Sequence, residues 1–475
     1  MEKRYSLGRY LAGAVAARAG DEMSGPALML AGFALTGSAV EASSLLAGVT
    51  VAAAVGGPAL GVLLDRSSRP GRLLAGALVL YAAGLGAILA GLGRLPFAGV
   101  LLIAVPVGLL GPALSGGWTA QLPRVIVPGE GCSERANALD AMTFGVASLA
   151  GPALAGGVAE ALGAPAAVVV SVALIALAAP AAWLLPAARP GRSRAARSRV
   201  VRARVVGLRV VRARAVGLRV VRARAVRLRA VRARAVRPRA ARPRHKRTPH
   251  TRPRHTRTAH VASVAGELVA GARVIVGRPA LARATVSSVV SCVAQGVFVA
   301  CVPLLGERAL GEPGRGALLL TCVAVSALAA NAVLARYPRA VAPDTVIWAS
   351  ALVQAAALSL VLAVTLVGRG HSLVLVVAAC VLGIGEGPQL TALFAVRHRE
   401  APERLRGQIF TTGASLKVTG FALGAAVAGP VAARSLPGAL ALATGVAALA
   451  ALACLLVAAP RPASSARLTE SGRGR

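Results

Sequence analysis

The sequence predicts an all-helical integral membrane protein with twelve transmembrane helices, and three observations carry that prediction. Of the 475 residues, 56% are apolar and only 15% are charged, against about 25% charged residues in soluble proteins. The mean hydropathy is +0.69. Twelve apolar runs reach the roughly 20 residues that a spanning helix needs. The composition therefore disfavours a compact soluble enzyme.

The twelve runs form two groups of six, separated by a basic segment. The first group lies near 10–36, 43–64, 72–92, 97–121, 136–160 and 165–186. The second group lies near 279–304, 315–335, 345–367, 372–395, 408–433 and 436–459. Charges interrupt the first run, which is also too long for the apolar core of a signal peptide, so we expect a retained helix.

Basic residues set the orientation, because cytoplasmic loops of membrane proteins are enriched in Lys and Arg. With a cytoplasmic N-terminus, most basic residues fall on the cytoplasmic side. The outer loops then carry only Arg94, Arg308, Arg315, Arg369 and Arg434. We expect a multi-pass protein of the plasma membrane with both termini in the cytoplasm.

The two groups of runs also repeat one another in sequence. Leu64-Asp65-Arg66 follows the second run, and Leu334-Ala335-Arg336 follows the eighth. Gly111-Pro112 in the fourth run is matched by Gly387-Pro388 in the tenth. The matches occur in one order and at nearly one offset. They predict two pseudo-symmetric six-helix bundles, with a substrate path between them near the middle of the bilayer.

We therefore expect an N-terminal bundle over 1–188, a basic cytoplasmic linker over 189–265, and a C-terminal bundle with a short tail over 266–475. Residues 189–257 hold 26 of the 54 Lys and Arg, and decapeptide copies begin at Arg202. Low complexity and like charge favour disorder. The segment is either a tandem expansion without function or a contact for anionic lipid headgroups. Nucleic acid is disfavoured as a partner, because the linker has no aromatic residue for base stacking.

Ionisable residues inside the apolar runs are the candidate proton or substrate site. Arg18, Asp21 and Glu22 lie in the first run, where Arg18 reaches either acid at helical spacing and leaves the other free. Glu386 lies in the tenth run, and Lys417 in the eleventh is its expected partner. Trp118 is expected either at the membrane interface or facing the substrate path. Asp140, near the start of the fifth run, is expected to pack against cytoplasmic loops.

The loop after the second run resembles a signature of the major facilitator superfamily. The matching positions are Gly61, Leu63, Asp65, Arg66 and Arg69. The sequence departs at Ser68, where the family has Gly, and at Pro70, where it has a basic residue. The resemblance implies that this loop is a gating motif that clamps the cytoplasmic ends of the two bundles.

Two further segments resemble exporters of that family. Gly151-Pro152-Ala153-Leu154-Ala155-Gly156 is similar to the Gly-Pro antiporter motif, with Ala155 in place of one Gly. Leu122 to Pro128, followed by Arg135 to Leu139, resembles the bacterial branch of siderophore and macrolide efflux carriers. The fourth run lacks the Arg of many proton-coupled exporters. The resemblance covers both groups of runs but not the basic linker.

The resemblance implies a monomeric secondary transporter that exports a small, partly apolar molecule in exchange for protons by alternating access. An importer or a carrier of another solute is the alternative within the class. A membrane scaffold or sensor with a degenerate transporter body is the alternative outside it. The sequence contains no phosphate-binding loop, no metalloprotease motif and no nucleophile elbow. We therefore expect no catalytic residues, no cofactor and no metal site, and we interpret the six cysteines as apolar filler.

Overall fold

The computed structural model describes residues 7–126, 132–187, 257–311, 315–337, 341–368 and 372–456. The described residues are helical, which confirms the predicted fold class. The N-terminal bundle consists of α1 (Leu7–Thr36), α2 (Ala39–Arg66), α3 (Pro70–Gly91), α4 (Phe97–Pro112), α5 (Cys132–Leu162) and α6 (Ala164–Trp183). The C-terminal bundle consists of α9 (Pro279–Leu310), α10 (Gly316–Arg336), α11 (Pro343–Val367), α12 (Ser372–Glu400), α13 (Arg406–Arg434) and α14 (Leu436–Leu456).

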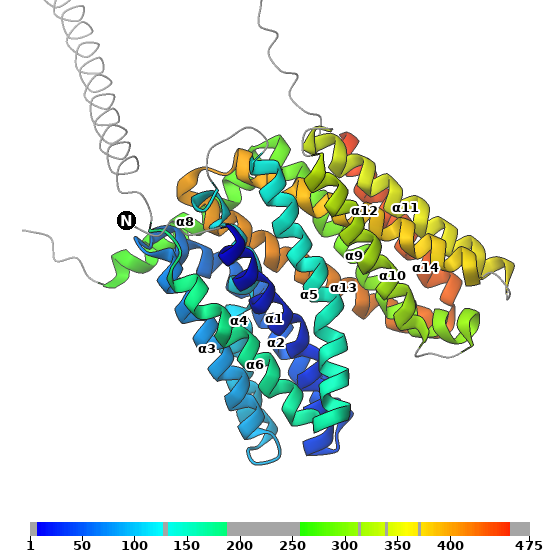
Figure 1. The fold of residues 1–475 in the computed structure, drawn as a ribbon, viewed down its shortest axis with the longest axis horizontal. Coiled ribbons are helices and arrows are strands. Elements are labelled where there is room, and N and C mark those ends of the chain that lie inside the picture. The colour runs from blue at the N-terminus through cyan, green and yellow to red at the C-terminus, as the bar shows by residue number, and fades with distance from the viewer. Residues whose placement is uncertain are drawn as a thin grey trace, which may run out of the picture. The chain divides into compact units, whose positions relative to one another are not determined.

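Helix packing repeats between the two bundles, which Figure 1 draws from blue to green and from green to red. α1 packs on α5 and α6, as α9 packs on α13 and α14. α2 packs on α4 as α10 packs on α12, and α3 on α6 as α11 on α14. Across the bundles, α2 packs on α13 and α10 packs on α5. These paired contacts give the pseudo-symmetry that the repeated sequence predicts.

Length and composition qualify 11 helices in the described ranges as membrane spans. α1 is long enough, with 30 residues, but Arg18, Asp21 and Glu22 lower its apolarity. The helix remains within the bundle because its other residues are small and apolar, and it packs closely against α5 and α6. Charged residues are tolerated in such a helix where they face the bundle interior.

The fourth predicted run is not one continuous α-helix. α4 ends at Pro112, and a π-helical turn follows over Ala113–Gly117, before a 3-10 turn over Leu122–Arg124. Pro112 has no backbone N–H to donate, which favours a break in the regular hydrogen-bond pattern. The break positions Trp118 and Thr119 inside the protein, where Trp118 is fully buried.

The described residues of the two bundles belong to one compact unit. An additional helix, α8 (Arg257–Gly277), precedes the C-terminal bundle. The rest of the predicted basic linker and both chain termini lie outside the described residues.

Candidate functional site

Asp65 joins the two bundles at the end of α2. Its Oδ1 accepts a hydrogen bond from the backbone N–H of Gly407 at 2.7 Å, and its Oδ2 accepts one from Gln408 at 2.8 Å. α13 begins at Arg406, so both donors belong to its first turn, where N–H groups have no partner within the helix. A carboxylate at this position also interacts favourably with the helix dipole. We call this end of the bundles the Asp65 end.

Two glycines of α2 allow close contact with α13 beyond Asp65. A Cβ at Gly61 would overlap the Thr411 hydroxyl group, and a Cβ at Gly57 would overlap backbone of α13. Gly57 N donates to Ser415 Oγ at 3.1 Å, and Ser415 Oγ donates to the Ala53 carbonyl at 2.7 Å. Twelve residues separate Ala53 from Asp65, which is about 18 Å of helix. The two bundles are therefore joined along this whole stretch of α2.

The other residues of the predicted gating motif have different surroundings. Arg66 Nε lies 2.8 Å from Glu267 Oε2 of α8. Gln408 Nε2 of α13 donates to the Leu268 carbonyl of the same helix at 3.1 Å. α8 thus contacts both bundles beside Asp65, a contact that no sequence pattern predicted. Arg69 is exposed at the N-terminus of α3 and does not join this group.

Two arginines, Arg124 and Arg406, place positive charge around Asp65. Burial lowers the pKa of the Arg124 guanidinium, and the charge of Arg406 lowers it further, whereas Asp65 opposes the shift. Asp65 is therefore placed between two cations from different bundles as well as on the end of α13. The sequence predicted the carboxylate but neither of these neighbours.

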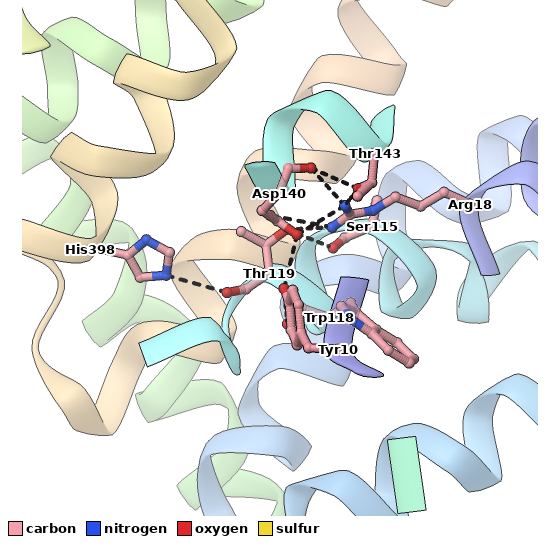
Figure 2. A network of polar contacts seen from close by, with 8 residues as sticks. All are labelled: Tyr10, Arg18, Ser115, Trp118, Thr119, Asp140, Thr143 and His398. Atoms are coloured by element: carbon pink, nitrogen blue, oxygen red, sulfur yellow. Dashed lines mark hydrogen bonds and ion pairs between the residues drawn. The ribbon is translucent and has the colours of Figure 1, made fainter. Parts of the chain in front are cut away.

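The prediction that Arg18 pairs with Asp21 or Glu22 is wrong. Arg18 is 2% exposed and forms an ion pair with Asp140 of α5, with Nη1 3.0 Å from Oδ1 (Figure 2). Asp140 is itself fully buried, so the expectation that it packs against loops is also wrong. A buried ion pair requires further hydrogen bonds to offset the loss of hydration. These come from Tyr10, Thr119 and Thr143.

The same network contacts the C-terminal bundle. His398 of α12 donates through Nε2 to the Thr119 carbonyl at 3.3 Å (Figure 2). Phe394 of α12 packs against Phe144 of α5, with ring centroids 5.6 Å apart, and against Phe410 of α13 at 6.0 Å. We call His398 and these three phenylalanines the aromatic plug. It joins α5 of the N-terminal bundle to α12 and α13 of the C-terminal bundle.

Asp21 and Glu22 point in different directions. Asp21 accepts a hydrogen bond from Tyr81 Oη of α3 at 2.9 Å, within its own bundle. Glu22 is exposed although it lies at the middle of α1. A Cβ at Gly151 of α5 would come within 2.6 Å of the Glu22 Cβ. The antiporter-like motif therefore allows α5 to lie directly behind Glu22, a relation that the sequence did not predict.

Lys417 of α13 interacts electrostatically with acids of both bundles. It acts on Glu22 of α1 and on Glu386 of α12. No ion pair at contact distance joins the three residues in the described part of the chain, and Gln295 of α9 forms a hydrogen bond with Glu386. The expected association of Lys417 with Glu386 is thus electrostatic and is shared with Glu22. We call Glu22, Glu386 and Lys417 the central charge cluster.

Among the remaining positions, Trp118 and several amides contribute to helix packing, whereas Pro152 is exposed. Trp118 packs against Tyr10 with ring centroids 5.9 Å apart and is fully buried, so it is not an interfacial anchor. Pro152 is exposed, and a Cβ at Gly156 would meet no atom within 4 Å. In the C-terminal bundle, buried amides join helices: Gln354 donates to Gln389, which donates to Ser291. Within the described ranges, no group of three or more His, Cys, Asp or Glu is arranged to hold a metal ion.

A family model for the Major Facilitator Superfamily matches residues 10–411. The chain belongs to this superfamily. As a member of the Major Facilitator Superfamily it is a multi-pass membrane transporter, and the contacts of Asp65 and Arg66 described above fall within the matched region.

Several solved structures share the fold of this chain. A bacterial homologue of the iron transporter ferroportin, in an outward-facing state, has 12% identity and a TM-score of 0.65, and covers 95% of this chain and 98% of its own. The human organic anion transporter MFSD10 has 14% identity and a TM-score of 0.63, with coverage of 96% and 100%. The E. coli fucose:proton symporter FucP has 15% identity and a TM-score of 0.57, with coverage of 96% and 100%. No curated protein matches the chain.

Proposed function

We propose that this secondary transporter exports a small, partly apolar molecule from the cytoplasm in exchange for protons. The central charge cluster carries the proposal. It places two carboxylates and one ammonium group at the middle of helices from both bundles. Glu22 can take up a proton from one side of the membrane and release it on the other, because its bundle rocks against the bundle that holds Lys417 and Glu386.

The contacts around Asp65 support alternating access. They join the bundles through hydrogen bonds to the first turn of α13, which are few and are lost together when α2 and α13 separate. The positive-inside rule assigns the Asp65 end to the cytoplasm. In that orientation this conformation is closed on the cytoplasmic side, and release of Asp65 opens the path for loading.

The proposal also includes a location and partners for the transporter. It resides in the plasma membrane as a monomer with both termini in the cytoplasm, and it belongs to the exporter branch. The bundles over 1–188 and 266–475 perform transport, and the basic linker over 189–265 contacts anionic lipid headgroups. Proton coupling occurs on this fold, since FucP is by its name a proton symporter.

Transport in inverted membrane vesicles tests the proposal. Vesicles with an acidic lumen, in which the proton gradient points outward, are offered a panel of partly apolar compounds, and uptake with proton release from the lumen is expected. Glu22→Gln is expected to abolish the coupled proton movement. Glu160→Gln is the matched control, because Glu160 is an exposed acid at the end of α5. Uptake that is equal in Glu22→Gln and in the wild type would refute the assigned proton site, and uptake driven only in the reverse direction would favour an importer.

A further inference from the structure

Arg397 of α12 is a buried cation without a counter-ion. Its side chain is 2% exposed, and it forms no hydrogen bond or ion pair with any described residue. Its Nε and Nη2 are both buried and lack a hydrogen-bond acceptor. An isolated buried charge is strongly unfavourable, and native proteins rarely retain one without a partner. This arginine therefore requires an anion at some stage of the transport cycle.

Cys292 of α9 interacts electrostatically with Arg397, but the two side chains form no hydrogen bond, and the carboxylates near Arg397 are already engaged or lie too far away. Glu400, one turn further along α12, pairs with Arg399 and Arg278. Glu386 is eleven residues away, which is about 16 Å along the helix. Asp140 is held by Arg18. The anion that satisfies Arg397 is therefore not supplied by these side chains in the closed conformation.

One edge of the Arg397 guanidinium group has no hydrogen-bond acceptor. Nε and Nη2 carry the two parallel N–H bonds along one side of the group, which is the edge that binds a carboxylate through two hydrogen bonds. A Cβ at Gly413 of α13 would overlap the guanidinium, so the absence of a side chain there makes room for it. The Phe410 ring lies 5.9 Å from Arg397 Cζ.

Aromatic side chains gather beside this cation in a chain that has few of them. The whole sequence contains only seven phenylalanines, and Phe144, Phe394 and Phe410 form the aromatic plug. Phe410 contacts both Phe394 and His398, with the imidazole centroid 4.5 Å from its own. Ring faces and edges of this kind bind flat or apolar groups. A cation and apolar rings thus stand side by side at the closed interface.

We propose that Arg397 and the aromatic plug form the loading site for amphipathic organic anions. The acidic group of the carried molecule binds the Nε and Nη2 edge of Arg397, and its apolar body packs against Phe394 and Phe410. Separation of the bundles at the Asp65 end breaks the bond from His398 to Thr119 and exposes this site. The inference rests on the proposed export function, to which it adds the substrate class and a site distinct from the central charge cluster.

Three naphthalene probes that differ only in charge test the substrate class. The full-length chain in nanodiscs of zwitterionic lipid is titrated with 1-naphthoate, 1-naphthylmethanol and 1-naphthylmethylammonium in a calorimeter. The wild type is expected to bind the carboxylate most tightly. Equal binding of the two charged probes, preference for the ammonium compound, or no binding of any probe would overturn the proposal.

Variants of Arg397 then test the site. Arg397→Gln is expected to weaken binding of 1-naphthoate at least tenfold with little change for 1-naphthylmethanol, and Arg397→Lys is expected to restore part of the affinity. Arg434→Gln, an exposed arginine at the far end of α13, is the matched control. Unchanged affinity for 1-naphthoate in Arg397→Gln would overturn the assignment. If the Gln variant does not fold, the comparison of Arg397→Lys with the wild-type probe series decides.

Transport measurements separate this inference from the function on which it rests. Specific binding of 1-naphthoate without transport in vesicles would refute the proposed function and leave the anion site in place. Transport of the anion that is indifferent to Arg397→Lys and Arg397→Gln would leave the function in place and refute the site.

Discussion

The two bundles each bury an arginine near the aromatic plug, but they treat its charge in opposite ways. Arg18 of the N-terminal bundle and Arg397 of the C-terminal bundle are both 2% exposed. Arg18 is neutralised by Asp140 and held by hydroxyl groups, whereas Arg397 has no acceptor among the described residues. The N-terminal charge therefore belongs to the folded structure itself. The C-terminal charge is left for a partner that enters from outside the chain.

The largest effect on stability is expected from breaking the ion pair between Arg18 and Asp140. Asp140→Ala leaves Arg18 buried without its counter-ion, which costs about 3–5 kcal/mol in the free energy of unfolding. Thermal unfolding of the purified protein in detergent measures the loss. The double variant Arg18→Met with Asp140→Ala is expected to recover part of it, because no unpaired charge remains. A melting temperature of Asp140→Ala equal to that of the wild type would show that Arg18 is not truly desolvated.

The second prediction is a gain in stability rather than a loss. Arg397→Met removes a buried cation that has no partner and replaces it with an apolar side chain of similar length. It is expected to stabilise the closed conformation by about 1–3 kcal/mol. The same melting experiment serves, with Arg434→Met as the surface control. A large destabilisation would contradict the contrast between the two arginines and would indicate a counter-ion that accompanies the protein.

The sequence predicted the helices because each membrane span must be long and apolar, and that constraint is visible in one chain. It also predicted Asp65 as an inter-bundle residue, through the family resemblance. It could not predict that Arg18 reaches Asp140, since the partner lies 122 positions away. The spacing rule for helices favoured Asp21 and Glu22, which share a helix with Arg18. In the folded chain both acids have other partners: Asp21 accepts a hydrogen bond from Tyr81, and Glu22 interacts electrostatically with Lys417 of α13.

The aromatic plug was missed for a related reason. Phe144, Phe394 and Phe410 come from three helices and two bundles, and only the folded chain brings them together. The only hint in the sequence was that phenylalanine is rare. That rarity does not show which phenylalanines lie together, because the chain could have placed them anywhere along the lipid-facing surface. Gly413 gave no signal in the sequence, because its lack of a side chain matters only beside Arg397, which the fold brings next to it.

The third prediction concerns the contact that holds the two bundles together. Asp65→Asn keeps one side-chain oxygen as an acceptor but loses the charge that favours the N-terminus of α13. The closed state is therefore expected to weaken by about 1 kcal/mol, and transport to slow severalfold while expression stays near normal. Glu41→Gln, in the first turn at the other end of α2, is the control. Transport at the wild-type rate in Asp65→Asn would mean that this contact does not limit alternation.

The smallest effect is expected from the segment between the bundles. The contrast between Arg18 and Arg397 involves only side chains of the helical body, so it should not depend on residues 202–257. The contacts of α8 with Arg66 and Gln408 come from Glu267 and Leu268, which a deletion of 202–257 retains. A ten-residue repeat also matches neither a helical face nor a strand, and it cannot supply a regular packing surface.

Deletion of 202–257, with a short flexible connector in its place, is therefore expected to leave melting temperature and transport per folded molecule unchanged. Adhesion of the basic repeat to anionic headgroups would alter only the salt dependence of association with vesicles, which the same samples can report. The two arginine variants are then repeated in the deleted background. If Asp140→Ala and Arg397→Met still shift stability in opposite directions, the difference belongs to the bundles. If the deletion folds but no longer transports, the repeat contributes to alternation itself, and the comparison must be extended to include it.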